Sequence, residues 1–218
     1  IPPDEHLVVV GPSGIGKSTL ANLVTGLTVP QRGVVRLGGV PIDRVRPADL
    51  HRAIALIPQE AYVFTGTLRE NIGYLRPEAT DAELAASCAE LGMVELVGRL
   101  GGYDATVAPR TLSAGERQLL SLARVHASHA RVVLLDEATC YLDPVAEERV
   151  ETALRRRPGT LVVIAHRISS ALRADRVLLL DGTAAHVGTH AELLERSPLY
   201  ADLVGNWVGA QRAAAGAG

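Results

Sequence analysis

The stretch Gly11-Pro12-Ser13-Gly14-Ile15-Gly16-Lys17-Ser18-Thr19 decides how the rest of the sequence is interpreted. It follows an apolar run at residues 7–10 and precedes an apolar helical periodicity that begins at Leu20, so we predict a strand, a tight turn and a helix. The glycines let backbone N–H groups close around phosphate groups, while Lys17 reaches the β and γ oxygens and Ser18 offers a hydroxyl to Mg²⁺. We therefore predict a nucleotide triphosphate site. Its phosphate-binding residues are expected to be Gly11, Ser13, Gly14, Gly16, Lys17, Ser18 and Thr19.

A glycine-rich turn between a strand and a helix is the alternative interpretation of this stretch. Such a turn would account for the glycines, but it gives no reason for the Lys17-Ser18 pair at the start of the helical segment. The pair favours phosphate binding over a purely structural turn.

The composition is that of a globular protein. The chain has 218 residues, of which 47% are hydrophobic, so it can bury the core of one domain. A net charge of −2 leaves no broad basic surface, which argues against a nucleic-acid partner. Cys88 and Cys140 are too few for a disulfide framework and suit a reducing compartment. No apolar run approaches the ~20 residues that cross a bilayer, and no secretory signal is visible.

Short apolar runs alternate with helical patterns along most of the chain. Buried strands that alternate with helices predict an α/β fold of the P-loop NTPase (RecA-like) class with a mostly parallel sheet. Residues 33–42 instead indicate a hairpin, which adds a small antiparallel region. Residues 62–109 carry no strand signal and show helical patterns, notably at 81–93, so we expect an inserted helical subdomain. The apolar runs lie at residues 7–10, 54–57, 132–135, 161–164 and 177–180.

These patterns divide the chain into four parts. Residues 1–61 form the first part of the ATPase core, residues 62–110 the helical subdomain and residues 111–205 the second part of the core. Residues 206–218 form a tail, whose end is rich in alanine and glycine and is expected to be frayed or a linker.

Two histidines, His126 and His129, stand at the i,i+3 spacing of a helix. A metal site would need further ligands, and none lies near them in the sequence. We expect both to face solvent at the end of a helix.

Two carboxylates follow the apolar run at residues 132–135. Asp136 and Glu137 would lie where a parallel sheet presents its active-site edge, and alternation along the strand would give the two acids different roles. We expect Asp136 to hold Mg²⁺ and Glu137 to polarise the water that attacks the γ-phosphorus. A strand that simply meets a polar loop is the alternative, and the phosphate-binding loop elsewhere in the chain argues against it.

Two further side chains follow apolar runs and are expected at the same edge of the sheet. His166 comes after the run at 161–165, where an imidazole would contact the γ-phosphate or the attacking water. Gln59 comes after the run at 54–58, where an amide would contact Mg²⁺ or water and bridge to the helical subdomain. The candidate catalytic residues are thus Glu137, His166 and Gln59, and the candidate Mg²⁺ ligands are Ser18, Gln59 and Asp136.

The segment Leu112-Ser113-Ala114-Gly115-Glu116 precedes a helix with an apolar face. Ser113, with Glu116 three residues later, is typical of a capping box. A helix N-terminus with free N–H groups and a glycine is also an anion site. The two interpretations use the same geometry and can hold together.

Taken together, these motifs resemble the nucleotide-binding domain of ABC transporters in order and in approximate spacing, to about residue 204. The Leu-Ser-x-Gly segment at 112–115 separates that family from other phosphate-loop ATPases. Segments 64–72, 163–167 and 188–194 resemble its exporter branch. The resemblance rests on residues 11–19, Gln59, residues 112–116, residues 132–137, Asp143 and His166.

The resemblance implies a head-to-tail dimer of ATPase domains that holds MgATP between one subunit's phosphate-binding loop and the other's signature helix. Ser113, Gly115 and Glu116 would act in trans on the partner's ATP, and Asp143 would lie at the dimer interface. Hydrolysis to ADP and phosphate would drive export through transmembrane domains at the cytoplasmic face of the cell membrane. Those domains are absent from this chain, which starts abruptly at Ile1, so we expect a fragment of an exporter.

Several residues depart from the family's usual pattern. Ala114 stands in place of a second glycine and Glu116 in place of a glutamine, which adds a Cβ and a negative charge beside an anion. Tyr141 replaces a small residue near Asp143, and no aromatic residue precedes Gly11 to stack on adenine. A regulatory or degenerate domain that hydrolyses ATP weakly is therefore one alternative. A soluble ABC ATPase outside transport is another, although the chain lacks a coiled-coil insertion and a basic surface.

Overall fold

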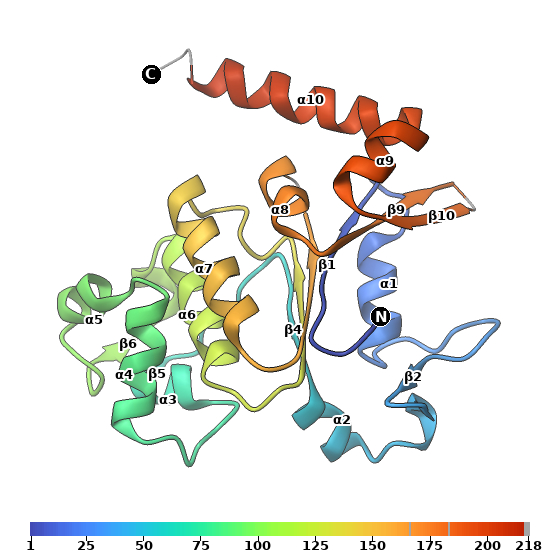
Figure 1. Cartoon of the computed structure of the whole chain (residues 1–218). Coiled ribbons are helices and arrows are strands. Elements are labelled where there is room, and N and C mark those ends of the chain that lie inside the picture. Colours follow the sequence, from blue (N-terminus) through green and yellow to red (C-terminus); the bar gives the residue numbers. More distant parts are fainter. Residues whose placement is uncertain (166, 183, 216–218) are drawn as a thin grey trace.

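A six-stranded sheet forms the centre of the computed structural model (Figure 1). The structure describes residues 1–165, 167–182 and 184–215, with side chains as far as residue 207. The strand order is β10-β9-β1-β8-β7-β4, and all neighbours are parallel except β9 and β10. Each predicted run forms a strand, which confirms the mostly parallel sheet. The strands are β1 (His6–Val10), β4 (Ile54–Ile57), β7 (Val132–Asp136), β8 (Thr160–Ile164), β9 (Arg176–Asp181) and β10 (Ala184–Gly188).

The edge strand β10 has no counterpart in the sequence prediction. Its residues before Gly188 are exposed, so no apolar alternation marks them as a strand. It pairs antiparallel with β9 after a turn that contains Gly182 at a φ of +58°. The strand therefore forms through backbone pairing rather than through burial of its side chains.

Helices cover both faces of the sheet because side chains alternate along its strands. In β1, Leu7 and Val9 pack with α1 and α2, whereas Val8 and Val10 pack with α6, α7 and α8. Figure 1 shows α1 on one side of β1 and α6 and α7 on the other. Burial of both faces explains why these strands appear as continuous apolar runs. The helices are α1 (Lys17–Val24), α2 (Pro47–Ala53), α6 (Ala114–His126), α7 (Pro144–Arg156) and α8 (Ile168–Arg173).

Residues 62–110 contain three helices, but two features differ from the prediction. The helix expected at 81–93 breaks at Gly92, whose φ of +72° is left-handed. In addition, β5 (Gly66–Thr67) pairs antiparallel with β6 (Thr106–Val107), although no strand is predicted there. Strands of this length are too short to show an alternating pattern. The helices are α3 (Leu68–Gly73), α4 (Asp81–Glu90) and α5 (Val94–Leu100).

His126 does not face solvent, so that prediction is wrong. Its side chain is 8% exposed because α6 packs against α4, and its Nδ1 lies 2.8 Å from the Oγ of Ser87. Burial lowers the pKa of His126. His129, three residues further on, has a side chain that is 68% exposed, as expected.

The predicted hairpin is present and consists of β2 (Arg36–Leu37) and β3 (Val40–Pro41). Gly38 and Gly39 connect the strands with φ values of +56° and +82°, which suit the tight turns that match the twist of a hairpin. Two short 3₁₀ helices, at Ile42–Arg44 and Pro109–Thr111, complete the connections.

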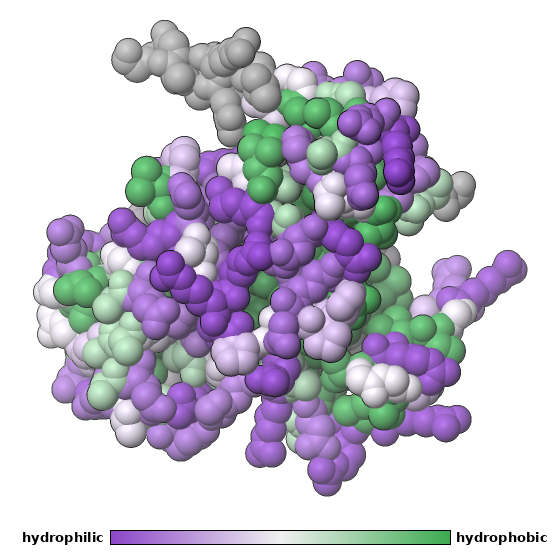
Figure 2. Space-filling model, viewed as in Figure 1, coloured by the Kyte–Doolittle hydropathy of each residue, from purple (hydrophilic) through white to green (hydrophobic). Residues whose placement is uncertain are grey.

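The C-terminal segment is helical rather than a linker, so the expectation for the tail needs correction. The chain continues after α9 (His190–Arg196) into α10 (Pro198–Ala215). The alanines near the end of α10 favour helix over coil. The fully buried Tyr200 anchors α10, and its Oη lies 2.8 Å from Nδ1 of His190. None of the helices in the described part of the chain has the length and apolar character that a bilayer crossing requires. The face in Figure 2 is mostly hydrophilic, with small apolar patches.

His6 in β1 makes the fold sensitive to acid. Its side chain is 1% exposed, and burial, followed by the charge of Arg155, lowers its pKa from 6.5 to about 4. Between these values the unfolded chain binds a proton that the folded chain does not, so stability falls as the pH drops through this window. We expect this group to cost about 2 kcal/mol of the free energy of unfolding between pH 7 and pH 5.

Urea unfolding of His6→Leu at these two pH values tests the expectation. The variant should lose about 2 kcal/mol less than the unmodified chain over the interval. Equal pH dependence of His6→Leu and the unmodified chain would contradict the assignment to His6.

Candidate nucleotide-binding site

The loop between β1 and α1 requires its glycines for two different reasons. Gly14 and Gly16 have φ values of +77° and +105°, which side chains with a Cβ rarely adopt. At Gly11 the reason is crowding, because a Cβ there would lie 2.7 Å from the backbone oxygen of Leu180 in β9. The loop is therefore folded tightly at the carboxyl end of β1.

The N-terminus of α1 carries no side-chain cap. Its N-cap residue is Gly16, and the first turn holds no acidic residue. The N-termini of α3, α4, α6 and α9 each have a complete capping box with a glutamate, whereas those of α2, α5 and α8 also lack a side-chain cap. The free N–H groups and the positive end of the helix dipole at α1 therefore fit an anion.

Lys17 turns back over the loop that precedes it. Its Nζ donates hydrogen bonds to the backbone oxygens of Gly11, at 2.9 Å, and Pro12, at 3.0 Å, and the residue is 8% exposed. Neutral carbonyl oxygens orient this ammonium group without cancelling its charge. Ser13, Ser18 and Thr19 are exposed beside it. A polyphosphate fits this combination of one positive charge, free N–H groups and hydroxyl groups.

The two predicted acids stand at the carboxyl end of β7. Asp136 is the last residue of the strand and pairs in register with Ile164 of β8. Glu137 donates its backbone N–H to the oxygen of Ile164 at 3.2 Å and has a φ of +55°. A left-handed glutamate is unusual, and such backbone strain is concentrated at functional sites. Because α1 contacts β7 directly, the acids and the phosphate-binding loop lie at the same edge of the sheet.

Gln118 is a functional candidate that the sequence analysis missed. Its side chain is fully buried in α6, and its Oε1 accepts the backbone N–H of Tyr141 at 3.0 Å. Its Nε2 lies 3.5 Å from the backbone oxygen of Gln59 and 3.3 Å from the Sγ of Cys140. One amide thus joins the segment after β4 to the segment after β7. Gln118 stands at helical spacing from Leu122 and Val125, so it is a polar residue on the apolar face of α6. This pattern is the feature of the sequence that could have identified Gln118.

The predicted capping box at the start of α6 is present. The backbone N–H of Glu116 donates to Oγ of Ser113 at 3.2 Å, and the backbone N–H of Ser113 donates to Oε2 of Glu116 at 2.8 Å. A Cβ on Gly115 would lie 3.0 Å from the backbone oxygen of Tyr141, so the loop after β7 packs closely on this turn. The signature segment and the loop after β7 are therefore in direct contact.

A family model described as "ABC transporter" matches residues 1–140, which hold the phosphate-binding loop, the signature segment and the acidic strand end. The chain belongs to the ABC transporter family. Domains of this family that bind nucleotide use ATP with Mg²⁺, and the fold described above is their P-loop NTPase fold.

Relatives of this ABC domain are similar over nearly the whole chain. The ABC transporter ATP-binding protein RamB of Streptomyces coelicolor is 58% identical over 207 residues, which is 95% of this chain and 34% of that protein. The ATP-dependent lipid A-core flippase of Alkalilimnicola ehrlichii is 39% identical over 93% of this chain and 36% of its own length. A bacterial Atm1-family ABC exporter, solved with ATP bound, has a TM-score of 0.88 at 35% identity and covers 94% of this chain and 37% of its own. The chain thus spans about a third of the length of these relatives.

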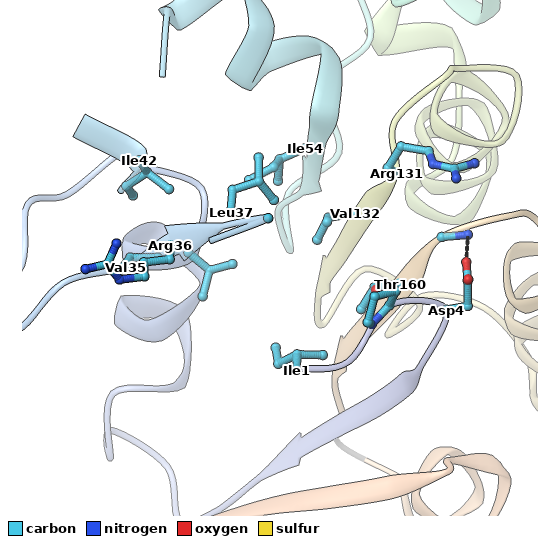
Figure 3. Close-up of a pocket in the computed structure, with 14 residues that line it drawn as sticks. Ile1, Asp4, Val35, Arg36, Leu37, Ile42, Ile54, Arg131, Val132 and Thr160 are labelled. Atoms are coloured by element: carbon cyan, nitrogen blue, oxygen red, sulfur yellow. Dashed lines mark hydrogen bonds between the residues drawn. The ribbon is translucent and has the colours of Figure 1, made fainter. Parts of the chain in front are cut away.

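A cavity of about 410 Å³ lies at the opposite edge of the sheet from the ABC nucleotide site. Figure 3 shows it between the hairpin, with Val35 and Leu37, and the amino ends of β4 and β7, with Ile54 and Val132. The amino ends of parallel strands are not the edge at which such sheets bind nucleotides. We therefore do not assign this cavity to ATP.

The structure places Asp143 but not His166, which lies outside the described residues. Asp143 caps α7, and its Oδ1 accepts the backbone N–H groups of Val145 and Ala146 at 2.9 Å. Its place at a dimer interface stays a prediction, because that role depends on a second chain. The catalytic role of His166 also stays a prediction.

A buried ionic cluster joins α7, which follows Asp143, to Arg167 and α8, which follow residue 166 in the chain. Glu147 and Glu151 of α7 are 3% and 1% exposed and are bound by Arg167, Arg173 and Ser170. Arg167 also donates to the backbone oxygen of Leu142 at 3.1 Å. Burial is the main reason that the pKa of Glu147 is raised, and the negative charge of Glu151 adds to the effect. The positive charge of Arg167 acts in the opposite direction and lowers this pKa. The cluster fixes the backbone next to Asp143 relative to the segment after β8.

Replacing Gln118 should destabilise this ABC domain. Gln118→Leu removes two partly buried hydrogen bonds, one from the N–H of Tyr141 and one to the oxygen of Gln59. A typical hydrogen bond contributes about 0.5–1.5 kcal/mol, so we expect a loss of about 1–3 kcal/mol in the free energy of unfolding, measured in urea. Ser121→Ala, on the same buried face, is the matched control, because Ser121 makes only a 3.4 Å contact to the backbone oxygen of Tyr62. A loss no larger in Gln118→Leu than in the control would contradict the bridging role.

Proposed function

We propose that this chain is the motor domain of an ABC exporter, which binds MgATP at residues 11–19 and hydrolyses it to ADP and phosphate. One observation carries the proposal. The glycine-rich loop, with Lys17 and the uncapped N-terminus of α1, lies at the same sheet edge as Asp136 and Glu137. This arrangement combines an anion site with a potential general base.

Each candidate residue has a part in the proposed reaction. The backbone N–H groups of the loop and the Lys17 ammonium bind the β and γ phosphates. Glu137 takes the proton of the attacking water, and Gln59 and His166 orient that water. Mg²⁺, held by Ser18, Asp136 and Gln59, would neutralise charge on the phosphates. Electrostatic stabilisation and positioning, rather than covalent catalysis, would supply most of the rate enhancement.

Hydrolysis by this mechanism needs two copies of the domain. Ser113 and Gly115 would contact the ATP of the partner copy, with Asp143 at the interface between the copies. Exposure of Ser113 and of the phosphate-binding loop in the single chain supports this arrangement, because both surfaces are accessible to a partner. The pair is a homodimer or a heterodimer, and each copy contributes half of each site.

The relatives support a proposal for the function at the membrane. The similar solved structure is an ABC exporter, and one relative is a lipid flippase, so we propose that ATP-driven pairing moves transmembrane domains from the cytoplasmic face of the membrane. The contact region would be near Gln59 and the helices of residues 62–110. The exported substrate would be chosen by those transmembrane domains, and nucleic acid is not a proposed partner.

Product analysis tests the proposed reaction. The 218-residue chain, incubated with MgATP, should release ADP and phosphate in equal amounts, and chelation of Mg²⁺ should stop the release. A phosphate release that is no faster than in buffer, in a sample that binds ATP, would contradict hydrolysis and leave only a nucleotide-binding role.

A further inference from the structure

The carboxylate of Glu116 has both of its oxygens engaged. Oε2 accepts the backbone N–H of Ser113 at 2.8 Å, and Oε1 forms an ion pair with Nη2 of Arg99. Arg99 lies in the last turn of α5, 17 residues before Glu116 in the chain. The side chain of Arg99 is 56% exposed and that of Glu116 is 24% exposed. The pair therefore connects α5 to the first turn of α6.

A glutamate at this position has opposite effects on two properties of the domain. Its negative charge is favourable for α6 itself, because it interacts with the positive end of the helix dipole. The same charge is unfavourable for a triphosphate that approaches that end of the helix. A guanidinium group beside the carboxylate removes most of this repulsion and keeps the capping hydrogen bond in place.

We propose that Arg99 is a positioning residue for the trans nucleotide site: it neutralises Glu116 and holds its carboxylate on the capping hydrogen bond, so that the start of α6 accepts the partner's ATP. The inference rests on the proposed function, since it concerns how the second copy of the domain receives the nucleotide. It gives a way in which a chain with Glu116 in its signature segment would pair around ATP. Arg99 acts through Glu116 and does not touch the nucleotide itself.

The test measures ATP-driven dimerisation of the 218-residue chain. Glu137→Gln is the background, because blocking hydrolysis keeps MgATP in place during sedimentation. In this background, Arg99→Ala should weaken the MgATP-dependent dimer about tenfold. Glu116→Gln keeps the capping box without the charge, so Arg99→Ala should have little effect once Glu116→Gln is present. Arg99→Lys keeps the charge and should restore most of the affinity.

Two controls separate this role from a structural one. Binding of a fluorescent ATP analogue to the single chain and the thermal midpoint should be the same with and without Arg99→Ala, because the side chain is more than half exposed. Arg46→Ala removes another exposed arginine–carboxylate pair, which Arg46 forms with Asp49 at 2.6 Å, and should not change dimer affinity.

The outcomes distinguish the inference from the function on which it rests. Dimer affinity that is unchanged in Arg99→Ala overturns the inference alone, as does an equally large loss in the presence and absence of Glu116→Gln. A Glu137→Gln chain that binds MgATP but does not pair overturns the proposed pairing and the inference with it.

Discussion

We expect Glu137→Gln to lower the turnover of MgATP by about 100-fold or more and to leave ATP binding unchanged. A general base contributes about 10²–10⁴-fold to such a reaction, and the amide cannot accept a proton at neutral pH. The substitution conserves size, and the left-handed φ of +55° at this position is tolerated by glutamine about as well as by glutamate. The loss should therefore appear in kcat, measured by phosphate release, while Kd for the fluorescent ATP analogue stays within about twofold.

A matched variant keeps this result specific to the site. Glu148→Gln removes an exposed acid on α7 and should retain the full rate. If Glu137→Gln kept more than a third of the turnover, Glu137 would not be the general base, and another group at the same edge would have to take its role.

We expect Lys17→Ala to weaken nucleotide binding itself, and not turnover alone. Hydrogen bonds to charged groups contribute about 1.5–3 kcal/mol each, so losing the ammonium should weaken MgATP binding by about 100-fold. Replacement by arginine should not restore binding, because the guanidinium is planar and larger than the space that the ammonium occupies between the oxygens of Gly11 and Pro12. Titration with the fluorescent analogue measures the affinity of both variants.

The composition of the chain offers a direct check of this prediction. Lys17 is the only lysine in the 218 residues, so an amine-reactive acylating reagent has one side-chain target besides the N-terminal amine. MgATP should protect Lys17 from acylation, and the N-terminal amine provides the internal control within the same peptide digest. Equal labelling of Lys17 with and without saturating MgATP would contradict contact between Lys17 and the phosphates.

The parts of the fold that the sequence predicts are those with a strong local pattern. β1, β4, β7 and β8 are largely buried on both faces, and β9 is buried on one face and half-buried on the other, so each is a continuous apolar run. β5, β6 and β10 are short or exposed, and tertiary pairing rather than local pattern forms them. The composition of the tail suggests a linker, whereas α10 continues through it as far as Ala215.

In the candidate site too, the residues that the sequence predicts belong to local motifs, and the residues that it does not predict make contacts with distant parts of the chain. Its loop and its acids are contiguous motifs and could be found from spacing alone. Gln118 and Arg99 act through partners 59 and 17 residues away, and no spacing in a single sequence indicates such contacts. Glu116 places a negative charge in the signature segment, and only the three-dimensional structure shows that Arg99 lies beside it.

The rate of MgATP hydrolysis per molecule, measured over a wide range of protein concentration, tests the central claim most directly. If two copies must pair to complete each site, the rate per molecule rises with concentration until pairing is complete, and it vanishes in Glu137→Gln at every concentration. A rate per molecule that is the same throughout the range, and that Glu137→Gln still abolishes, would contradict the paired mechanism and assign hydrolysis to the single chain.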